Sequence, residues 1–578
     1  MGLRSIFLAI ALLPTLACAE AIPEDQITQR IHSHLIIRDG LSAREEALIG
    51  LQKYPNSKLL WQGYIRALAK NGDEKAMMLC WRHFIKRFPE ESQNHEILEN
   101  LAWAVIEKGA KSSSPIVRAT ALLGACFSQD AKGVVILRKG LSDGNSFLRA
   151  AAVKLSSLLL DASLQEGILD LFKTEKVWSV RLEAIKALGE FQREDSRDLL
   201  LKIISQEQCH SEEKAAAIES LVAIADGIES EHIEHLVQNG KAGMRQLACK
   251  FIAHFEKKDD INLLFPILHD PSRDVRAEIF QTLGRLRVST FGNYSVIELC
   301  KQAVTDPDPL VAITAAWTLT LNDSKKGQEA FELLLNHHTP EVRCLAAAAL
   351  AATGKYGAPL ALQAFKVNPD SFVRMNLALG LIGQRTHIQE ACDCLFQGLS
   401  KQKEQWEFRE VGSFSPLVSS KVKHDDSIPN YPEAVNQLAR LEILEKLAIV
   451  HYPGTQQALK SFLMECNWGI NGLASALLLT EGDEEAVDLV TALLKDPEQK
   501  VRIQAAIILA LWSNAEETVQ ILQEAYPSAE RELKGQILES LGRVGSPSSL
   551  VFLADKLQEP YQTLRIIAAA ALLECLYH

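Results

Sequence analysis

The strongest constraint on the fold of this sequence is a basic residue that recurs at a nearly constant spacing. Aligned on the stretch DPSRDVRAEIFQTLG, the basic position is occupied by Arg118, Arg149, Arg181, Lys214, Arg245, Arg276, Arg343, Arg374, Arg502, Lys534 and Arg565. From residue 118 to residue 276 the steps are 31, 32, 33, 31 and 31 residues, and from residue 502 to residue 565 they are 32 and 31. A period of this length indicates a repeat protein.

Each repeat has the pattern of two helices. Apolar residues follow the basic position at three, four and seven residues, as Ile279, Phe280 and Leu283 do after Arg276, which describes one face of an amphipathic helix. Asp-Pro or Asn-Pro precedes several of these helices and marks the turn that starts them. A second amphipathic segment lies upstream, as in EAVDLVTALL. One pair cannot bury its apolar faces alone, so the sequence predicts an all-α superhelix (solenoid) of stacked helical hairpins.

The repeats resemble HEAT repeats, in particular the short HEAT-like form also found in bilin lyases. The resemblance rests on a turn Asp, a Val-Arg pair and an Ala-rich second helix, as in DPEQKVRIQAAIILAL, and covers residues 111–400 and 434–578. In that family the Arg and the turn Asp form a ladder between repeats. The resemblance therefore implies that Arg276 reaches an acidic or carbonyl acceptor of an adjacent turn, with its stem packed on apolar surface. The same inter-repeat role is expected of Arg118, Arg149, Arg181, Arg245, Arg343, Arg374, Arg502 and Arg565. Ala312 and Gly472 occupy this position in two repeats, so packing alone is expected to hold those interfaces.

Residues 22–110 carry a different helical pattern. Pro55 and Pro89 lie 34 residues apart, each after an aromatic residue, and large aromatic residues fill the predicted helix pairs. The segment is similar to tetratricopeptide-type helix pairs, without their full signature. At a minimum it predicts an all-helical cap for the open end of the array.

Residues 401–433 interrupt the repeats with a stretch rich in Ser, Val and aromatic residues. Its lack of helical period predicts an extended loop or a small hairpin. Long structured loops of solenoids often carry function, so Trp406 and Phe408 are candidate contacts of a partner. A poorly ordered linker is the alternative. As a contact loop outside the core, the insertion is expected to be removable without loss of the helical fold.

The first 21 residues have the composition of a secretory signal peptide. One Arg in MGLRS precedes the short apolar run IFLAIALLPTLA, and CAEA offers small residues for cleavage. A second interpretation is a lipid anchor on Cys18, although Thr15 stands where such signals usually carry Leu. A third is the uncleaved apolar start of a cytosolic protein. We expect an exported protein, in the periplasm, in the cell envelope or secreted, that meets a membrane only if Cys18 is lipidated.

Composition and motifs argue against several functions. The net charge of −12 does not suggest the basic footprint of a nucleic-acid binder. The sequence lacks the common phosphate-loop, dinucleotide, nucleophile-elbow and zinc-protease motifs. His232 and His235 stand one helical turn apart, but a metal would need further ligands from elsewhere. We therefore expect no cofactor and no catalytic site; the resemblance to bilin lyases leaves an enzyme that attaches tetrapyrroles as an alternative.

The second helices of HEAT-type arrays line the concave side of the superhelix. The residue five positions after the basic one is expected to point into that side, and this row becomes apolar at Trp317, Ala348 and Leu379. Exposed apolar rows often mark interaction sites, and Trp is a common anchor. The sequence thus predicts a concave groove that holds a partner segment, with packing between neighbouring second helices as the alternative. The expected function is that of a non-enzymatic scaffold or adaptor for protein–protein interaction; the alternative is a lipid-anchored envelope component in assembly or transport.

Overall fold

The computed structural model describes residues 22–577 except 207–208, 226, 228, 401–404, 420–430, 466–483, 511 and 513–514. The predicted signal peptide, Cys18 and Gly472 lie outside the described residues. The described chain is almost entirely helical, with sheet only in two short hairpins. Within it, no helix is both long enough and apolar enough to cross a membrane.

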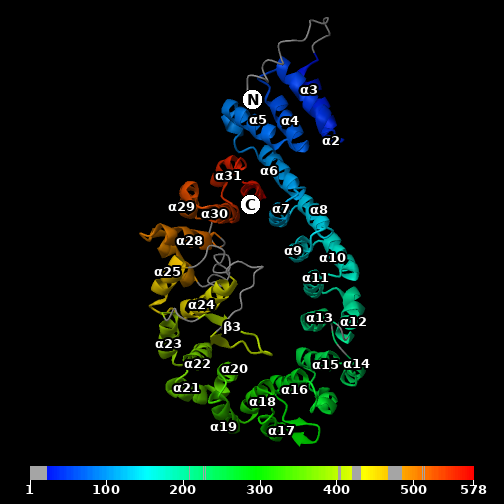
Figure 1. Cartoon of the computed structure of the whole chain (residues 1–578). Coiled ribbons are helices and arrows are strands. Elements are labelled where there is room, and N and C mark those ends of the chain that lie inside the picture. Colours follow the sequence, from blue (N-terminus) through cyan, green and yellow to red (C-terminus); the bar gives the residue numbers. More distant parts are fainter. Residues whose placement is uncertain are drawn as a thin grey trace.

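A small N-terminal module opens the chain (blue in Figure 1). It consists of α2 (Glu24–Ile36), α3 (Gly40–Lys53), α4 (Lys58–Lys70), α5 (Glu74–Arg87) and the 3-10 turn η1 (Pro89–Glu91). Asp39, Ser57 and Asp73 begin three of these helices, each accepting a hydrogen bond from a first-turn N–H, which satisfies a donor that the helix itself leaves open. Ile27 and Ile31 belong to a small core that α2, α3 and α4 share.

The first half of the array is a row of helical hairpins that descends on the right of Figure 1. Its helices are α6 (His95–Ala110), α7 (Pro115–Phe127), α8 (Ala131–Gly140), α9 (Ser146–Ser157), α10 (Ala162–Thr174), α11 (Trp178–Glu190), η2 (Glu194–Ser196), α12 (Arg197–Ser205), α13 (Ser211–Ile224), α14 (Ser230–Val237) and α15 (Ala242–His254). The second helix of each pair (α7, α9, α11, α13 and α15) lies on the inside of the curve (Figure 1). Helix α6 packs against both α4 and α7, so the module and the array share it.

The array then turns and ascends on the left. It continues with η3 (Ile261–Ile267), α16 (Arg273–Leu286), β1 (Thr290–Phe291), β2 (Tyr294–Ser295), α17 (Val296–Ala303), α18 (Pro309–Asn322), α19 (Ser324–Leu335), α20 (Pro340–Ala351), η4 (Gly354–Tyr356), α21 (Ala358–Val367), α22 (Ser371–Gly383) and α23 (Ile388–Ser400). After the insertion follow α24 (Tyr431–Ile449), α25 (Thr455–Glu465), α27 (Glu484–Ala492), η6 (Leu493–Lys495), α28 (Gln499–Leu509), α29 (Glu516–Ala525), η7 (Tyr526–Ser528), α30 (Arg531–Val544), η8 (Pro547–Ser549), α31 (Leu550–Lys556) and α32 (Gln562–Tyr577).

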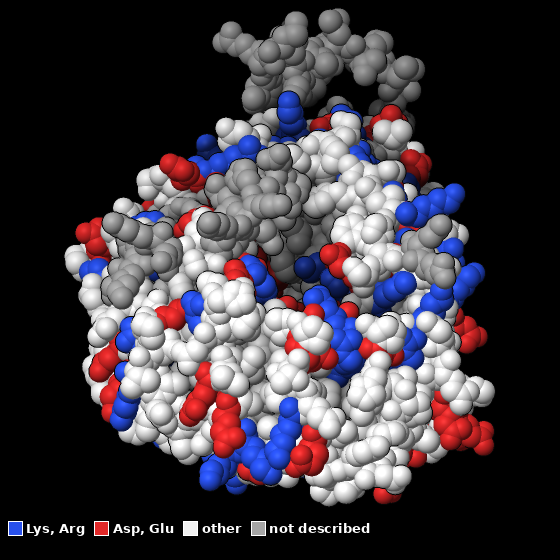
Figure 2. Space-filling view, turned by 60° about the horizontal axis from the view of Figure 1, so that its bottom comes forward, with Lys and Arg blue, Asp and Glu red and all other residues white. Residues whose placement is uncertain are grey.

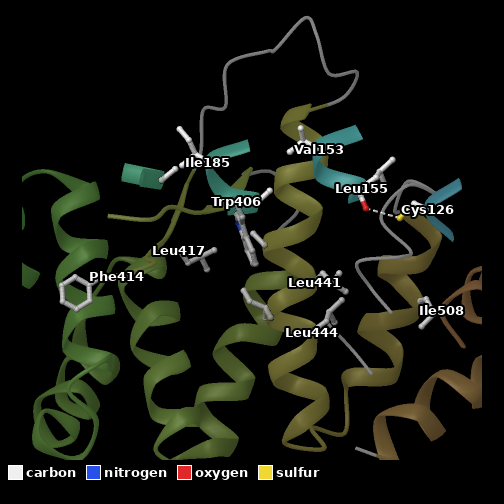
Figure 3. Close-up of a cluster of buried hydrophobic side chains, with 14 of the residues drawn as sticks. Cys126, Val153, Leu155, Ile185, Trp406, Phe414, Leu417, Leu441, Leu444 and Ile508 are labelled. Atoms are coloured by element: carbon white, nitrogen blue, oxygen red, sulfur yellow. Dashed lines mark hydrogen bonds between the residues drawn. The ribbon is translucent and has the colours of Figure 1, made fainter. Parts of the chain in front are cut away.

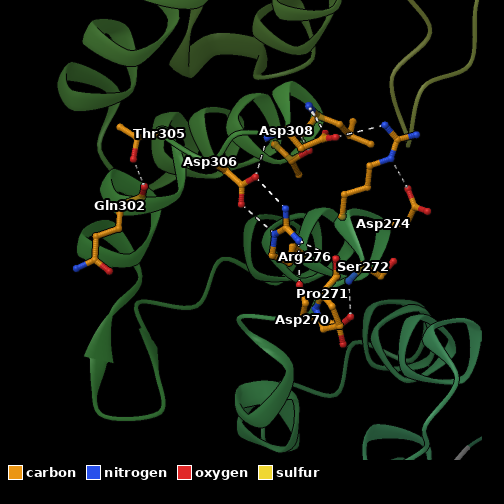
Figure 4. Close-up of polar contacts among 12 residues, drawn as sticks. Asp270, Pro271, Ser272, Asp274, Arg276, Gln302, Thr305, Asp306 and Asp308 are labelled. Carbon is orange, nitrogen blue, oxygen red and sulfur yellow. Dashed lines mark hydrogen bonds and ion pairs between the residues drawn. The ribbon is translucent and has the colours of Figure 1, made fainter.

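The recurring arginines form a ladder between successive repeats. Arg276 Nε and Nη2 both donate to the carboxylate of Asp306 in the next turn, each at 2.9 Å, and Nη1 donates to the carbonyl of Asp270 in its own turn, also at 2.9 Å (Figure 4). The two side chains are 17% and 14% exposed, so the pair is screened only partly by water. The same arrangement recurs in the pairs Arg118–Asp143, Arg149–Glu175, Arg181–Glu213, Arg245–Asp270 and Arg343–Asp370.

Two arginines of the series differ from this pattern. Arg502 donates to the carbonyls of its own turn, Asp496 and Pro497, at 2.7 and 2.9 Å. Arg374 departs further, since its buried Nε has no hydrogen-bond partner among the described residues. The acceptor expected for Arg374 would lie in the segment after α23, where residues 401–404 are outside the described residues, so its inter-repeat bond stays a prediction.

The array closes on itself. Helix α32 packs against α6 and α7, beside which it lies in Figure 1. Arg565 pairs with Glu74 at the start of α5, and Lys108 Nζ lies 3.2 Å from the same carboxylate. Gly109 makes room for this contact, because a side chain there would collide with Ile566. The last repeat thus stacks on the first as any repeat stacks on its neighbour, with Glu74 taking the place of the turn acid.

This closure corrects the expected role of residues 22–110. The sequence predicted that they cap an open end of the array. In the described chain the second helix of the first repeat is covered by α32 instead, and the N-terminal module packs on α6 from outside the ring. In the second half of the array, Lys460 of α25 pairs with Asp496 at 2.8 Å and so links α25 to the α27–α28 repeat. The apolar core accordingly runs as one connected cluster from Ile65 to Cys575.

Candidate protein-binding site

A short β-hairpin of the insertion lies against the inner helices of the ring (Figure 1). Strands β3 (Trp406–Phe408) and β4 (Leu417–Ser419) pair antiparallel, with Phe408 opposite Leu417. Strand β3 packs on α24, and strand β4 packs on α20 and α22. The insertion therefore contains the small hairpin that its sequence suggested, and this hairpin sits on the face where the row of Trp317, Ala348 and Leu379 runs.

A buried amide fixes strand β4. The backbone N–H of Leu417 donates to Asn376 Oδ1 at 2.9 Å, and Asn376 Nδ2 donates back to the Leu417 carbonyl at 2.8 Å. Leu417 is fully buried and Asn376 is 2% exposed. Helix α22 thus offers the strand the two bonds that a neighbouring strand would offer, so no backbone group of Leu417 is buried without a partner.

Trp406 anchors the other strand in the core. Its backbone N–H donates to Asn436 Oδ1 at 3.0 Å, the Arg440 guanidinium lies 4.5 Å from the centre of the indole ring, and this ring meets Phe372 edge to face. The side chain is 2% exposed and lies among the helices of the inner face in Figure 3. Trp406 is therefore a packing residue that no partner can reach, which corrects the expected partner contact at this position.

The tip of the hairpin covers the start of the concave row. Phe414 packs edge to face on Trp317 with ring centres 6.0 Å apart. Gly412 allows the turn, because it adopts a φ of +63°, which disfavours any residue with a side chain. The Trp317 ring also lies tight against Gly284, where a side chain would collide with it. Trp317 is half-buried as a result, and much of its apolar surface contacts the chain itself.

The described part of the insertion before α24, residues 405–419, is consequently part of the core and not a loop outside it. Trp406, Phe414, Leu417 and Val418 are all nearly or fully buried. The expectation that residues 402–432 can be removed without effect on the fold is corrected by these contacts, at least for the described part of the segment. The physical reason is that the inner helices α18, α20, α22 and α24 carry apolar surface on the inner side of the ring, and the hairpin removes it from water.

An open cavity remains where the hairpin and the concave row meet. It measures about 660 Å³ and is lined by two of the predicted residues, Leu379 of α22 and Phe408 of β3, both half-buried. The rest of the wall consists of Ile382, Gly383, Arg385, Ile388, Glu442, Lys446, Ile449, Val450 and His451. Its size is that of a typical ligand pocket, and its wall is apolar with a few polar groups.

Charged groups stand at the edge of this cavity. Burial and the neighbouring carboxylate of Glu445 raise the pKa of Glu442, while Lys446 counteracts them. Arg385 is exposed at the turn after α22 with a φ of 53°. The apolar floor suits an apolar side chain of a peptide. The charged groups at the edge suit the polar groups and the backbone on either side of that side chain, which stay near water.

The charges on one face of the molecule are mixed in sign. On the face that Figure 2 shows, Lys and Arg side chains alternate with Asp and Glu over a largely uncharged surface, which is hollowed near its middle. Single-sign stripes are the footprint of nucleic-acid binding, and this face carries none. Among the described residues, no group of three or more His, Cys, Asp and Glu side chains is placed to hold a metal.

Sequence reasoning missed Asn376, Asn436 and the partner of Arg440. Arg440 occupies the repeated basic position, yet its Nη1 donates to the Leu399 carbonyl at 3.0 Å and its guanidinium stacks on Trp406. The available signal was a polar residue inside an otherwise apolar helix, as in RMNLALGLIG, since a buried amide needs partners. The sequence could not show which backbone it would bind.

Comparisons with known proteins agree with this architecture. Residues 296–382 and 486–573 match the family model of HEAT repeats. No curated protein sequence matches the chain. The similar solved structures include the karyopherin Kap121p bound to Pho4p, at 13% identity over 96% of this chain and 79% of that one, with a TM-score of 0.32.

Two further solved structures are similar over smaller shares of this chain. The UNC-45 chaperone is 12% identical over 94% of this chain and 74% of its own, with a TM-score of 0.32. Human deoxyhypusine hydroxylase is 15% identical over 50% of this chain and 98% of its own, with a TM-score of 0.19. Scores this low carry no functional argument. The family match, the arginine ladder and the stacked helical hairpins together identify the chain as a HEAT-repeat α-solenoid.

Proposed function

We propose that this chain is an exported, non-enzymatic scaffold that holds a segment of another protein at the cavity beside the β3–β4 hairpin. HEAT-repeat solenoids are typical protein-interaction scaffolds, because their stacked hairpins present a long continuous surface. The proposal places the contact on the inner side of the ring, at residues Leu379 and Phe408.

The observation that carries the proposal is the cavity itself. Two separate sequence features, the apolar row of the second helices and the insertion, meet at this one place, and both contribute wall residues. The hairpin is fixed by the Asn376 amide and by buried Trp406, so the wall is already formed before a partner arrives. A preformed apolar pocket with few polar groups loses little conformational entropy on binding.

Site-specific photo-crosslinking tests the proposal. A benzoylphenylalanine at position 408 should capture a discrete partner in the cells that make the protein, and the adduct is identified by mass spectrometry. The matched control is position 147, because Phe147 is also a phenylalanine but lies 66% exposed on the distant helix α9. A Leu379→Glu variant should lose the adduct and keep the circular dichroism of the wild type.

The opposite results would remove the proposal. If positions 408 and 147 capture the same proteins, or if Leu379→Glu captures as well as wild type, then the cavity does not select a partner. The capture result does not depend on the export part of the proposal, which is tested separately.

Export rests on the composition of the first 21 residues. Mass spectrometry of the protein from its native cells should find a mature N-terminus at Glu20 or Ile22. An acylated Cys18 would instead make the scaffold a lipid-anchored envelope component, and an intact Met1 would show that the protein is not exported through this segment.

A further inference from the structure

A second cavity lies where the N-terminal module meets the array. It measures about 380 Å³ and lies between the α2–α3 turn, the end of α4 and the helices α6, α7 and α8. None of the residues proposed above for partner binding lines it. It is thus a separate site on the molecule.

The cavity is strongly basic, although the whole chain carries a net charge of −12. Six cationic and two acidic side chains line it, which gives the wall a net formal charge of +4. Two of the cations are already paired, Arg118 with Asp143 at 2.8 Å and Lys132 with Glu99 at 2.9 Å. A concave basic surface on an acidic protein raises the local concentration of anionic groups.

Four of the cations have no carboxylate partner within the described chain. They come from four different elements that the fold brings together: Arg38, Lys70, Lys111 and Lys139. All four are exposed, so water solvates them and a ligand can approach them. Because they surround one recess, a single ligand with several negative charges could satisfy them together.

The floor of the cavity is apolar. Leu122 and Ile136 are 4% and 7% exposed, and Val135 stands 54% exposed on α8 beside them. Next to Arg38, the aliphatic side chains of Ile37 and Leu41 are 72% and 66% exposed. A bare inorganic anion would leave this apolar surface in water, whereas a ligand with aliphatic groups would bury it.

We propose that this junction cavity binds an acidic protein segment that carries aliphatic side chains between its carboxylates. The carboxylates pair with Lys70, Lys111 and Lys139, and an aliphatic side chain enters the recess over Val135. A bilayer surface fits less well, because the cations line a recess that a flat layer of headgroups cannot enter. The inference is independent of the proposed function, since it concerns a different surface and a different ligand chemistry.

The test uses the full chain and a random-peptide phage library. Selected peptides should be enriched in Asp and Glu beside Leu, Ile and Val, and a labelled synthetic peptide of the strongest sequence should bind in fluorescence anisotropy. The double variant Lys70→Glu/Lys139→Glu should bind this peptide at least about tenfold more weakly than wild type, because two attractions become repulsions. Val135→Ser should also weaken binding, since it removes apolar contact.

The matched control is Lys202→Glu/Lys366→Glu, which makes the same charge change at two exposed lysines on α12 and α21, helices that do not line the cavity. It should bind like wild type, and all variants should melt at the same temperature. Equal weakening in both double variants would overturn the proposal, because the effect would then be one of overall charge. Selection of peptides without acidic residues would also overturn the proposal. The same holds if phosphatidylglycerol vesicles bind through these lysines and no peptide does. Photo-crosslinking at position 408 should be unchanged in Lys70→Glu/Lys139→Glu, which separates a failure here from a failure of the proposed function.

Discussion

Replacing Arg276 by Ala removes one rung of the ladder and tests whether the ladder holds adjacent repeats together. The variant loses two bonds to the Asp306 carboxylate and the bonds to the carbonyls of Asp270 and Pro271. It also loses the packing of the Arg stem.

The magnitude follows from partial burial. An exposed ion pair contributes at most about 1 kcal/mol, and breaking a fully buried pair costs about 3–5 kcal/mol. Arg276 and Asp306 are 17% and 14% exposed, so we expect a loss of about 2 kcal/mol, between these limits. Asp306→Asn removes the charge. Its side-chain oxygen can still accept the hydrogen bond that the Asp308 backbone N–H donates to Asp306 Oδ1 at 2.9 Å in the wild type. In the double variant Arg276→Ala/Asp306→Asn, the loss of stability should be smaller than the sum of the two single losses by about 1 kcal/mol or more.

The assay is hydrogen exchange read by mass spectrometry, together with thermal melting. A long repeat array does not unfold as one unit, so a single unfolding free energy would be poorly defined. Exchange should accelerate in α16 and α18, on either side of the broken rung, and less in distant repeats. Arg82→Ala is the control, because Arg82 is exposed on α5 and its loss should change stability by less than about 0.5 kcal/mol.

The pH dependence gives a second, independent reading. Burial raises the pKa of Asp306, but the bonds from Arg276 and from the Asp308 N–H outweigh burial and hold it below its ordinary value of 3.8. A lowered carboxyl pKa stabilises the fold above that ordinary value, and this stabilisation disappears as the pH falls through the lowered pKa. The difference between wild type and Arg276→Ala should therefore shrink below about pH 4. Equal exchange in wild type and variant at neutral pH would refute the ladder as a source of stability.

Three further perturbations address the hairpin, the last helix and the ring closure. Asn376→Ala leaves the buried N–H and carbonyl of Leu417 without partners, so it should destabilise residues 406–419 by about 2–5 kcal/mol, seen as faster exchange in that segment. Glu574→Gln should raise the melting temperature at pH 8: burial raises the pKa of Glu574 to about 7 from its ordinary 4.5, so wild-type stability falls as the pH rises between these values and the Gln variant should lack this slope. Arg565→Ala and Glu74→Ala should each speed exchange in both α6 and α32, and the double variant should add little, because both single changes break the same contact; additive effects would contradict the pairing.

The sequence specified the local parts of this fold more fully than its global geometry. The spacing of Arg276 and its equivalents predicts both the helical hairpins and the rungs, because each rung joins neighbours along the chain. Closure depends instead on small rotations between repeats that add up around the ring, and Arg565 meets Glu74 across 491 positions of the sequence. No periodic signal marks Glu74, which lies outside the repeats.

The candidate site shows the same division. Leu379 and Phe408 were predicted as partner contacts because both are apolar residues in places where a solenoid exposes them; both line the cavity, and their contact with a partner stays a prediction. The burial of Trp406 was not found, since an aromatic residue in an insertion has the same pattern whether it contacts a partner or the core of its own chain. Asn376 decides between these cases, because its amide binds the hairpin backbone, and that pairing spans 41 residues.

The contact of α32 with α6 and α7 changes how such an array can come apart. A linear solenoid frays from its ends, because a terminal repeat has only one neighbour to leave. In a ring every repeat has two neighbours, so the first step of unfolding must break two interfaces at once, which raises the barrier to unfolding. The circumference is also fixed, so gaining or losing one whole repeat, a common event in the evolution of linear solenoids, would here pull Arg565 away from Glu74 and open the circle.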